Sequence, residues 1–351
     1  MDYDIVIATA NRPDVLRVSL PTLLRQTRPP KSLIIADASR DHDLLAATVR
    51  EATSQAPFAV HVFRTSPGAG PQRNAALPYA TSEVIFFPDD DSLWYEDVAE
   101  NVMRIYERDV ERRIGGVGQA ETFEPPFRLT QQHDAARRGS LATTVKYKLS
   151  TWRHGLLNRL VENPLHACGL DLLARHDAPQ WLAELNAVPI ERQIGFRMSF
   201  RSEAVRRYRF DEDLHLPRSA LEDFELSFAV LHEQLLVEAR GARVYHHRFG
   251  GSRGQGIESG VQQFLNMCYI VCKHAPPGSR ARRALKGYTR IFLTEAALLR
   301  APLSAFERDK MRGMYRARRA FAYLLNSPPE ELTQRYKRAL KACLQGEPAP
   351  R

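Results

Sequence analysis

The stretch VIFFPDDDSLW, which runs from Val84 to Trp94, places three consecutive aspartates directly after an apolar run. No lysine or arginine lies within six residues of this acidic triplet on either side. Neighbouring carboxylates repel and raise one another's pKa, so the triplet costs free energy unless another group compensates its charge. Alternate side chains of an extended segment point the same way. We therefore expect Asp89 and Asp91 to share one face and Asp90 to turn aside.

A divalent metal site is the function that this pattern indicates. Ligands of open parallel sheets bind in the crevice beyond the carboxyl ends of the strands, and the triplet follows such an end. Two converging carboxylates suit Mg²⁺ or Mn²⁺, which take oxygen ligands and leave positions for phosphate oxygens. We predict that Asp89 and Asp91 hold this metal, whose charge would relieve their repulsion. The alternative is that Asp89 to Ser92 only cap a helix starting near Trp94, because Asp and Ser are favoured caps.

Upstream of the triplet the sequence alternates between strand-like and helix-like segments. Strands rich in apolar residues are predicted at residues 3–9, 32–36, 59–63 and 83–87. Helices are predicted from Asn11 onward, where Asn and Pro favour a helix start, and over 43–54 and 68–80. Strands that alternate with helices of about a dozen residues indicate βαβ units. We predict an α/β fold with a Rossmann-like, mostly parallel sheet flanked by helices.

Downstream of residue 120 the pattern is less regular. A strand is predicted at 196–200, an amphipathic helix at 221–235, and short strands at 237–239 and 243–246. Beyond residue 258 nearly every segment is helical in pattern. We divide the chain into a nucleotide-sugar half at 1–120, an acceptor and catalytic half at 121–256 with an insertion at 121–193, and a helical tail at 257–345.

The whole chain of 351 residues has the composition of a globular protein. It enters a strand directly after Met1, which predicts that there is no signal peptide. Its longest apolar run, near residues 264–272, is shorter than the roughly 20 residues that cross a bilayer. The four cysteines show no paired CxxC spacing, which favours reduced thiols in a cytoplasmic protein.

Positive charge is concentrated in the tail. Residues 273–351 contain 18 Lys and Arg against 6 Asp and Glu, a net charge of +12, whereas the whole chain has +9. A basic helical tail is compatible with peripheral contact with the inner face of a membrane, with a homodimer contact, or with solvated helix faces. Nucleic acid is the least favoured of the partners that such a charge can attract.

Six short segments, in order along residues 5–247, resemble the motifs of the family-two glycosyltransferases with the GT-A fold. These segments are IVIATANR at 5–12, GAGPQRN at 68–74, DDD at 89–91, GFRMSFRSEA at 195–204, EDFEL at 222–226 and VYHH at 244–247. Each motif is weak alone, and their shared order makes the resemblance specific. It implies transfer of a sugar from a nucleotide diphosphate donor to the hydroxyl of a carbohydrate, lipid-linked or small-molecule acceptor.

The resemblance also implies roles for single residues. The metal at Asp89 and Asp91 would act as a Lewis acid on the departing diphosphate. Asp223, with Glu222 beside it, would be the general base for the acceptor hydroxyl, and a helix N-terminus would favour its ionised form. One base without an evident nucleophile implies inversion. Without the other motifs, ordinary acidity in the first turn of a helix would be the preferred explanation of this acidic pair.

Further residues of the same motifs are candidates for the metal and the donor. We favour His246 over His247 as a third metal ligand, although histidines are more often satisfied polar residues. The residues that the resemblance assigns to the donor are Thr9, Asn11, Arg12, Asp37, Arg73, Asn74 and Asp90. Arg73 is alternatively a surface arginine. Where relatives have D-D-G-S or D-N-G-S, this chain has Ala36-Asp37-Ala38-Ser39, which leaves the nucleobase contact of Asp37 open.

Two features outside the motifs each allow two interpretations from the sequence. The glycine-rich segment from Gly250 to Gly254 is either a loop that closes over phosphates or a plain surface turn. Trp152 and Trp181 either stack on sugar or belong to the core, and we favour the core.

Rival functions follow from the same residues. A metal-dependent nucleotidyltransferase would also use aspartates on a similar sheet. A non-catalytic protein that binds carbohydrate or nucleic acid would keep the fold without turnover. The turn from Gly68 to Gly70 lacks the Lys-Ser/Thr pair of a P-loop and the spacing of a dinucleotide site, which disfavours kinases and dehydrogenases.

Overall fold

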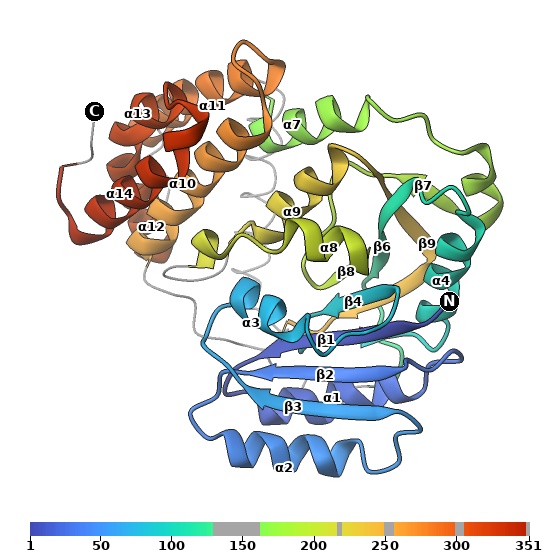
Figure 1. Cartoon of the computed structure of the whole chain (residues 1–351). Helices are drawn as coiled ribbons and strands as arrows, with labels where there is room; N and C mark the ends of the chain where they lie inside the picture. Colours follow the sequence, from blue (N-terminus) through green and yellow to red (C-terminus); the bar gives the residue numbers. More distant parts are fainter. Residues whose placement is uncertain (129–161, 216–219, 249–255, 299–304, 349–351) are drawn as a thin grey trace. The chain divides into compact units, whose positions relative to one another are not determined.

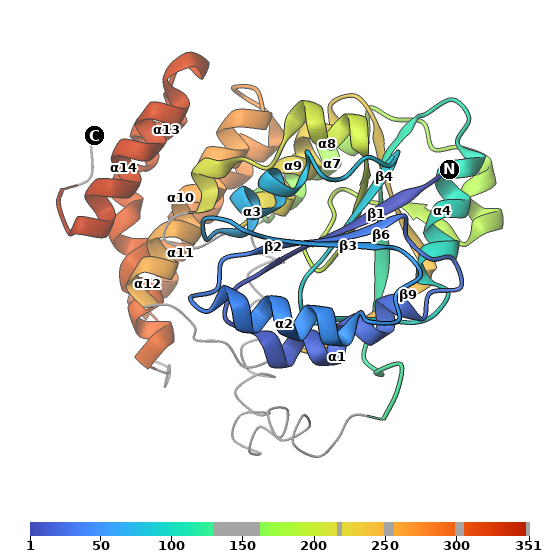
Figure 2. The same ribbon diagram turned by 60° about the horizontal axis from the view of Figure 1, so that its bottom comes forward.

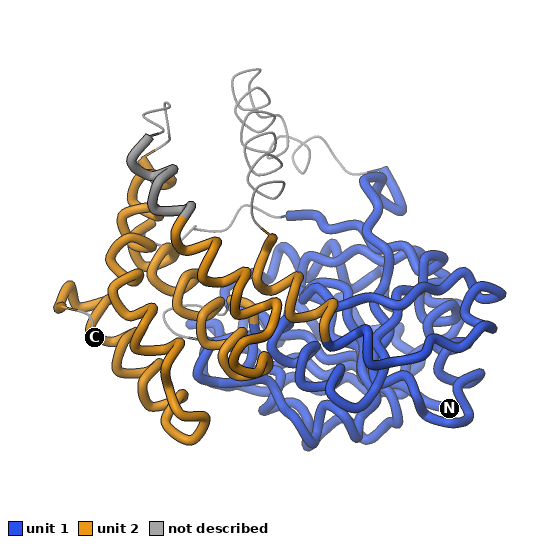
Figure 3. Tube along the Cα trace, turned by 90° about the horizontal axis from the view of Figure 1, so that it is seen from above, with its two compact units in different colours: residues 1–133, 172–215, 222–250 blue, residues 134–171, 216–221, 251–351 orange. Residues whose placement is uncertain are grey.

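The structure is a computed structural model that describes residues 1–128, 162–215, 220–248, 256–298 and 305–348. The chain divides into two compact units (Figure 3). Unit 1 comprises residues 1–133, 172–215 and 222–250, and unit 2 comprises residues 134–171, 216–221 and 251–351. Both halves of the predicted catalytic domain therefore contribute to unit 1, and most of unit 2 is the predicted tail.

Unit 1 is built on a nine-stranded sheet with the order β3-β2-β1-β4-β8-β6-β9-β5, and β7 pairs with β9 (Figure 1). The strands are β1 (Tyr3–Thr9), β2 (Ser32–Asp37), β3 (Ala59–Arg64), β4 (Val84–Pro88), β5 (Ser92–Trp94), β6 (Ile114–Thr122), β7 (Ala187–Pro189), β8 (Arg197–Arg201) and β9 (Leu235–His246). The predicted α/β class is confirmed. The sheet is mixed, because parallel pairing is found along β3-β2-β1-β4 and between β6 and β9 while the other pairs are antiparallel.

Helices of unit 1 flank this sheet. They are α1 (Pro13–Leu24), α2 (His42–Ala52), α3 (Ala69–Ala76), α4 (Val98–Arg108), α8 (Ser202–Tyr208) and α9 (Glu222–Leu231), with short 3₁₀ turns η1 (Gln180–Leu185) and η2 (Glu212–His215). Figures 1 and 2 show α1 and α2 side by side along the β1–β3 part of the sheet. Every residue of β2 and β4 is buried, as expected for strands that are covered on both faces.

The parallel strands bring polar residues to one edge of the sheet. Thr9 and Asp37 are paired at the ends of β1 and β2, and the triplet follows β4. Carboxyl ends of neighbouring parallel strands meet at the same edge, which is where ligands bind in such sheets. The fold therefore collects the predicted donor and metal residues from distant parts of the sequence.

Two sequence predictions near the site are wrong in their details. Trp94 lies in β5, not in a helix, and α4 begins only at Val98, so the triplet does not cap a helix. The helix predicted at 221–235 ends at Leu231, and its residues from Glu225 to Leu231 are all buried. It is not amphipathic, because this run of seven consecutive buried residues covers every side of the helix.

The two short strands predicted at 237–239 and 243–246 form one strand, β9, of 12 residues. A register shift opposite Gln119 and Ala120 of β6 separates its two parts. This irregularity interrupts the apolar pattern of the strand. The sequence pattern alone therefore predicts two short strands instead of one long strand.

Unit 2 is helical, as the tail pattern predicts. Its main helices are α10 (Gly256–His274), α11 (Arg280–Leu298), α12 (Ala305–Ala317), α13 (Phe321–Leu325) and α14 (Leu332–Gln345), with 3₁₀ turns η3 (Arg318–Ala320) and η4 (Pro329–Glu331). Helix α7 (Pro164–Leu173) supplies residues to both units. Among the described helices, none combines the length and the apolar character that crossing a bilayer requires.

Helices α10 and α12 approach each other through glycines. A Cβ atom on Gly260 would lie 1.9 Å from the carbonyl oxygen of Lys310, and one on Gly313 would lie 2.0 Å from that of Ile257. Neither position can carry a side chain unless the backbones separate. The two helices therefore form a tightly packed pair within unit 2.

Candidate active site

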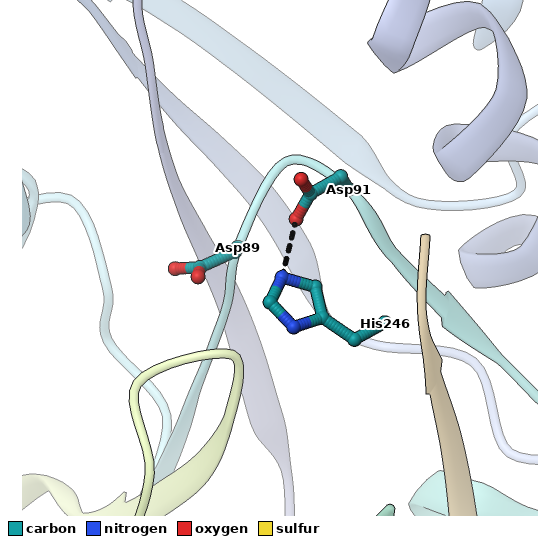
Figure 4. Close-up of side chains that lie close together, drawn as sticks. All are labelled: Asp89, Asp91 and His246. Carbon is teal, nitrogen blue, oxygen red and sulfur yellow. Dashed lines mark ion pairs between the residues drawn. The ribbon is translucent and has the colours of Figure 1, made fainter. Parts of the chain in front are cut away.

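The acidic triplet occupies the loop that joins β4 to β5. Asp89 and Asp91 of this loop lie near His246 at the end of β9 (Figure 4). One potential ligand atom from each of the three side chains lies within 4.8 Å of the other two. His246 pairs with Ser92 across the β5–β9 ladder, and its Nε2 lies 3.2 Å from Oδ1 of Asp91. Its ring stacks on Phe196 at a centroid distance of 4.3 Å. These contacts orient the imidazole toward Asp91.

This donor set fits a divalent cation. Two carboxylate groups and one imidazole offer the oxygen and nitrogen ligands that Mn²⁺ and related ions accept. The side chain of Asp89 is 40% exposed, so the group of three opens to solvent, where a phosphate oxygen can complete the coordination. The structure thus brings together the three residues that the sequence suggests as ligands.

Two arginines from distant segments already balance the charge of the triplet. Arg12 donates from Nη1 to Oδ1 of Asp90 at 2.5 Å and from Nη2 to Oδ2 of Asp91 at 3.0 Å. Arg73 donates from Nη2 to Oδ1 of Asp89 at 2.9 Å. The repulsion within the triplet therefore does not by itself require a metal. The sequence could not show this, because neither arginine is near the triplet along the chain.

Asp90 and Asp91 differ in their pKa although they are adjacent. Burial raises the pKa of Asp90 to about 7, against the opposing effects of Arg12 and the hydroxyl of Thr9, which donates to it at 2.7 Å. Burial also acts to raise the pKa of Asp91, but its hydrogen bond to His246 and the charges of His246 and Arg12 lower it below its usual value. Asp91 is therefore the permanently ionised member of the pair.

Arg73 connects the metal loop to the start of α9. Its side chain is 2% exposed and lies in α3, so the surface alternative is wrong. Besides Asp89, it donates from Nη1 to Oε1 of Glu222 at 3.1 Å and from Nη2 to the carbonyl of Gly195 at 3.4 Å. One buried guanidinium thus holds three segments that are far apart in sequence.

Asp223 lies in the first turn of α9, beside this network. Its Oδ2 accepts the backbone N–H of Gly195 at 2.8 Å, and its Oδ1 accepts that of Phe224 at 3.0 Å. Burial, followed by the charge of Glu222, raises the pKa of Asp223 to about 7, although Gly195 and Arg73 act to lower it. The prediction that the helix terminus favours the ionised form is wrong in its net effect, because burial outweighs the backbone donors.

Residues at the ends of β1 and β2 shape a turn. Asp37 is fully buried; its Oδ1 accepts the N–H of Ser39 at 2.8 Å, and its Oδ2 lies 2.7 Å from Nδ1 of His42. Asn11 has a left-handed backbone (φ 57°) and accepts the N–H of Arg40 at 2.9 Å. Both oxygens of Asp37 are therefore engaged inside the protein.

Two residues of α3 are supporting groups. Gln72 donates to the carbonyls of Thr9 and Ala36 at 2.9 and 2.7 Å, which fixes α3 to the ends of β1 and β2. Asn74 is buried and bonds to the backbone of Phe210 through both its oxygen and its nitrogen. The sequence analysis assigned no role to Gln72, Ser39 or His42, although Gln72 lies inside the segment GAGPQRN and Ser39 inside the segment 36–39. His42 lies outside these segments, five residues after Asp37.

Some predicted features lie outside the described residues. These are Trp152 and the glycine-rich segment from Gly250 to Gly254. Trp181 is described, and it is a partly buried side chain that packs against the core of unit 1.

Comparisons with known proteins bear on this site. Residues 4–157 match the family model described as glycosyl transferase family 2. A search of curated proteins finds no match.

Several solved structures have similar folds. S. aureus TarS has 13% sequence identity and a TM-score of 0.50, with 98% of this chain and 53% of that chain covered. TarS 1-349 in complex with UDP-GlcNAc has 12% identity and a TM-score of 0.49, with 99% and 93% covered. Mannosyltransferase PcManGT from Pyrobaculum calidifontis, in complex with GDP-Man and Mn²⁺, has 14% identity and a TM-score of 0.49, with 98% and 86% covered.

The present chain spans about half the length of the longer TarS chain, and at this identity the likeness shows the fold alone. The fold, the ordered motifs and the family match agree. They support a glycosyltransferase domain within residues 4–157, the range that the family 2 model matches.

Proposed function

We propose that this protein transfers a sugar from a nucleotide diphosphate donor to an acceptor hydroxyl, with inversion at the sugar carbon. One observation carries the proposal above the others. The cluster of Asp89, Asp91 and His246 and the carboxylate of Asp223 belong to one network in unit 1, which Arg73 and Gly195 join. A donor diphosphate at the cluster would therefore present its sugar near Asp223.

In this proposal the metal site stabilises the leaving diphosphate. Asp89, Asp91 and His246 would hold Mg²⁺ or Mn²⁺, which when bound supplies Lewis-acid stabilisation of the leaving diphosphate. Asp91 suits this role because its pKa is lowered, so it presents a full negative charge at neutral pH. Arg12 and Arg73, which pair with the triplet, add positive charge beside the position of the diphosphate.

Asp223 would act as the general base. A carboxylate whose pKa is about 7 is close to the value at which a base both ionises at neutral pH and accepts a proton well. The N–H groups of Gly195 and Phe224 hold its two oxygens and so orient it. Glu222 is paired with Arg73, which suits a positioning residue.

The donor nucleoside would lie at the ends of β1 and β2. Thr9, Asn11 and Arg12 are at this edge, and Asp37 supports the turn from inside. Asn74 holds α3 in place. The acceptor would be a carbohydrate, a lipid-linked sugar or a small molecule, and the basic unit 2 is the candidate surface for membrane contact or for a homodimer.

Donor screening tests the proposal. Purified protein is mixed with UDP-, GDP-, dTDP- and CDP-sugars, with and without Mn²⁺, and its melting temperature is recorded, because ligands that bind the folded state raise it. We expect one nucleotide class to give a metal-dependent rise that the variant Asp91→Asn loses. Release of nucleoside diphosphate from that donor then supports transfer. Release of pyrophosphate from a triphosphate would indicate a nucleotidyltransferase instead, and binding without any turnover would indicate a non-catalytic protein.

A further inference from the structure

A cavity of about 350 Å³ opens in unit 2, where α12 and η3 face the end of α14. It is lined by Arg312, Tyr315, Arg316, Arg319, Gly346, Glu347 and Pro348. We call it the arginine cavity. Its size is at the lower end of the range for small-ligand sites, which begins at about 300 Å³.

Three arginines of the cavity lie on one helical face. Arg312, Arg316 and Arg319 are spaced by four and three residues along α12 and η3, which stacks them on the same side. Like charges at this spacing destabilise a helix. The arrangement is therefore unfavourable for the free protein unless anions offset it.

Local partners account for only part of this charge. Arg312 pairs with Asp309 at 2.9 Å, but the two side chains are 72% and 40% exposed, so this ion pair contributes little. Arg316 donates to the carbonyl of Cys343 at 3.1 Å. In the part of the chain that the structure describes, neither Arg316 nor Arg319 forms an ion pair.

Arg316 has a structural explanation that the other two arginines lack. Helix α14 ends at Gly346, whose backbone is left-handed (φ 78°), and a cation stabilises the carbonyl end of a helix. That effect is confined to the last turn of a helix. Arg316, which belongs to α12, contacts the last turn of α14 through the carbonyl of Cys343. Arg312 and Arg319 remain as guanidinium groups at the cavity without such a role.

The remaining groups are held in place. Tyr315 is half exposed and packs under the guanidinium of Arg318, which lies 4.8 Å from its ring centroid. Helix α12 itself is fixed against α10 by the close approach at Gly260 and Gly313. The cavity therefore presents its guanidinium groups from a rigid element, which lowers the entropic cost of binding.

We propose that the arginine cavity binds a phosphate-bearing anion. A guanidinium group donates two parallel hydrogen bonds to phosphate oxygens, and Arg312 and Arg319 would do so from positions seven residues apart on the same helical face, with the phenol of Tyr315 beside them. The only carboxylate among the lining residues is that of Glu347. This site lies within unit 2 and is independent of the transfer reaction proposed for unit 1.

Calorimetric titration of the full chain with pyrophosphate, in the presence of a metal chelator, tests this site. The variants are Arg312→Gln and Arg319→Gln. The matched control is Lys286→Gln, which removes one exposed charge from α11 of the same unit. We expect saturable binding that each arginine variant weakens roughly tenfold, the effect of losing a hydrogen bond to a charged group, and that the control changes less than twofold.

A second arm identifies the source of the phosphate. The chain is sedimented with phosphatidylcholine vesicles that contain or lack phosphatidic acid. Retention that requires phosphatidic acid, and that Arg319→Gln and pyrophosphate both abolish, supports the site and assigns it to a lipid headgroup. Pyrophosphate binding without retention supports the site and assigns it to a soluble phosphate.

The proposal is overturned if the wild-type chain shows no saturable binding, or if Lys286→Gln weakens binding as much as the two arginine variants. Circular dichroism and thermal unfolding of every variant exclude misfolding as the cause of lost binding. Arg319→Lys keeps the charge but not the two-pronged donor, and we expect its affinity to lie between those of the wild type and Arg319→Gln.

Discussion

Asp91 and Asp223 are carboxylates of the same unit whose surroundings shift their pKa values in opposite directions. His246 and Arg12 outweigh burial at Asp91, whereas burial and Glu222 dominate at Asp223. At neutral pH, Asp91 is fully ionised and Asp223 is only partly so. Such a division between two acids of one unit suits a metal ligand in one case and a proton acceptor in the other.

The pH dependence of transfer follows from Asp223. A base must be ionised, and the pKa of this carboxyl is raised to about 7. We expect kcat/KM to rise with pH and to level off above about pH 7. Asp223→Asn should lower kcat by about 10²- to 10⁴-fold while donor binding, measured by calorimetry, is retained. A rate that does not change between about pH 6 and pH 8 would contradict the assignment.

The same pKa shift predicts how folding stability changes with pH. The folded pKa of Asp223 is about 7, above the unfolded value of about 3.9, so the folded state binds more protons between these values. Stability from this group is therefore fully present below about pH 4 and is lost as pH rises through about 7. Asp223→Asn replaces the carboxyl with an amide that does not ionise, so the variant does not lose this stability as the pH rises. We expect its free energy of unfolding to exceed that of the wild type by on the order of 4 kcal/mol at alkaline pH, because about three pKa units separate the folded and unfolded values.

Urea unfolding at several pH values measures this difference. The excess stability of Asp223→Asn should shrink steadily toward pH 5. An excess that is the same at all pH values would mean that the substitution acts through packing and not through ionisation.

One buried side chain, that of Arg73, connects several elements of unit 1. Arg73 of α3 contacts the loop after β4, the loop before β8 and the first turn of α9. Because the guanidinium carries a charge with its donors in a fixed plane, it can serve all three partners at once. The positions of the acidic groups thus depend on a helix that carries none of them.

Arg73→Met should therefore disturb both stability and activity. It leaves Glu222, whose side chain is 11% exposed, without its positive partner, and breaking such a pair costs about 3 kcal/mol or more. Arg17 pairs with Asp14 on the surface, with side chains 46% and 80% exposed, so Arg17→Met should cost less than about 0.5 kcal/mol. Urea unfolding compares the two variants, and equal losses would show that Arg73 is not a structural centre.

The end of β9 provides a test of the metal site. His246→Ala removes one of the three grouped side chains. We expect the Mn²⁺ concentration for half-maximal activity to rise at least about 10- to 100-fold, since losing even an outer partner of a metal ligand costs that much. His61 is an exposed histidine of β3, and His61→Ala should leave the metal dependence unchanged. Unaltered metal dependence in His246→Ala would remove this residue from the site.

The whole molecule is assembled by a chain that passes repeatedly between its two units. Unit 2 needs residues 134–171 and 216–221 as well as the C-terminal helices. Within unit 2, Asn266 of α10 donates to the carbonyl of Ala220 at 2.8 Å, and Arg280 of α11 pairs with Glu162. These contacts join segments that lie far apart in the sequence.

Truncation after residue 250 should therefore not yield a clean catalytic domain. The internal segments of unit 2 would lose their helical partners and expose buried side chains, which favours aggregation. We expect the truncated chain to elute as aggregates on size-exclusion chromatography and to melt without a cooperative transition. A monomer that unfolds cooperatively within a few degrees of the full chain would contradict this account of the units.

The local sequence was sufficient for the elements whose pattern is continuous. Residues 3–9 and 32–37 form buried strands because unbroken runs of Ile, Val and Leu fit a sheet that is covered on both faces. The strands β5 and β6 were not predicted, since β5 has only three residues and β6 contains glycines at positions 115, 116 and 118. Both strands form because they pair with β9, and their own sequences do not show a strand pattern.

The sequence by itself determined which residues are the candidates for the chemistry: the acidic triplet, the pair Glu222–Asp223 and His246 all lie in recognisable motifs along the chain. Only the tertiary structure decided how they are charged. Arg12 and Arg73 reach the triplet across long separations in sequence, and burial sets the pKa of Asp223. The physical reason is that a motif is local, whereas desolvation and ion pairing depend on which distant groups the fold places within a few ångströms.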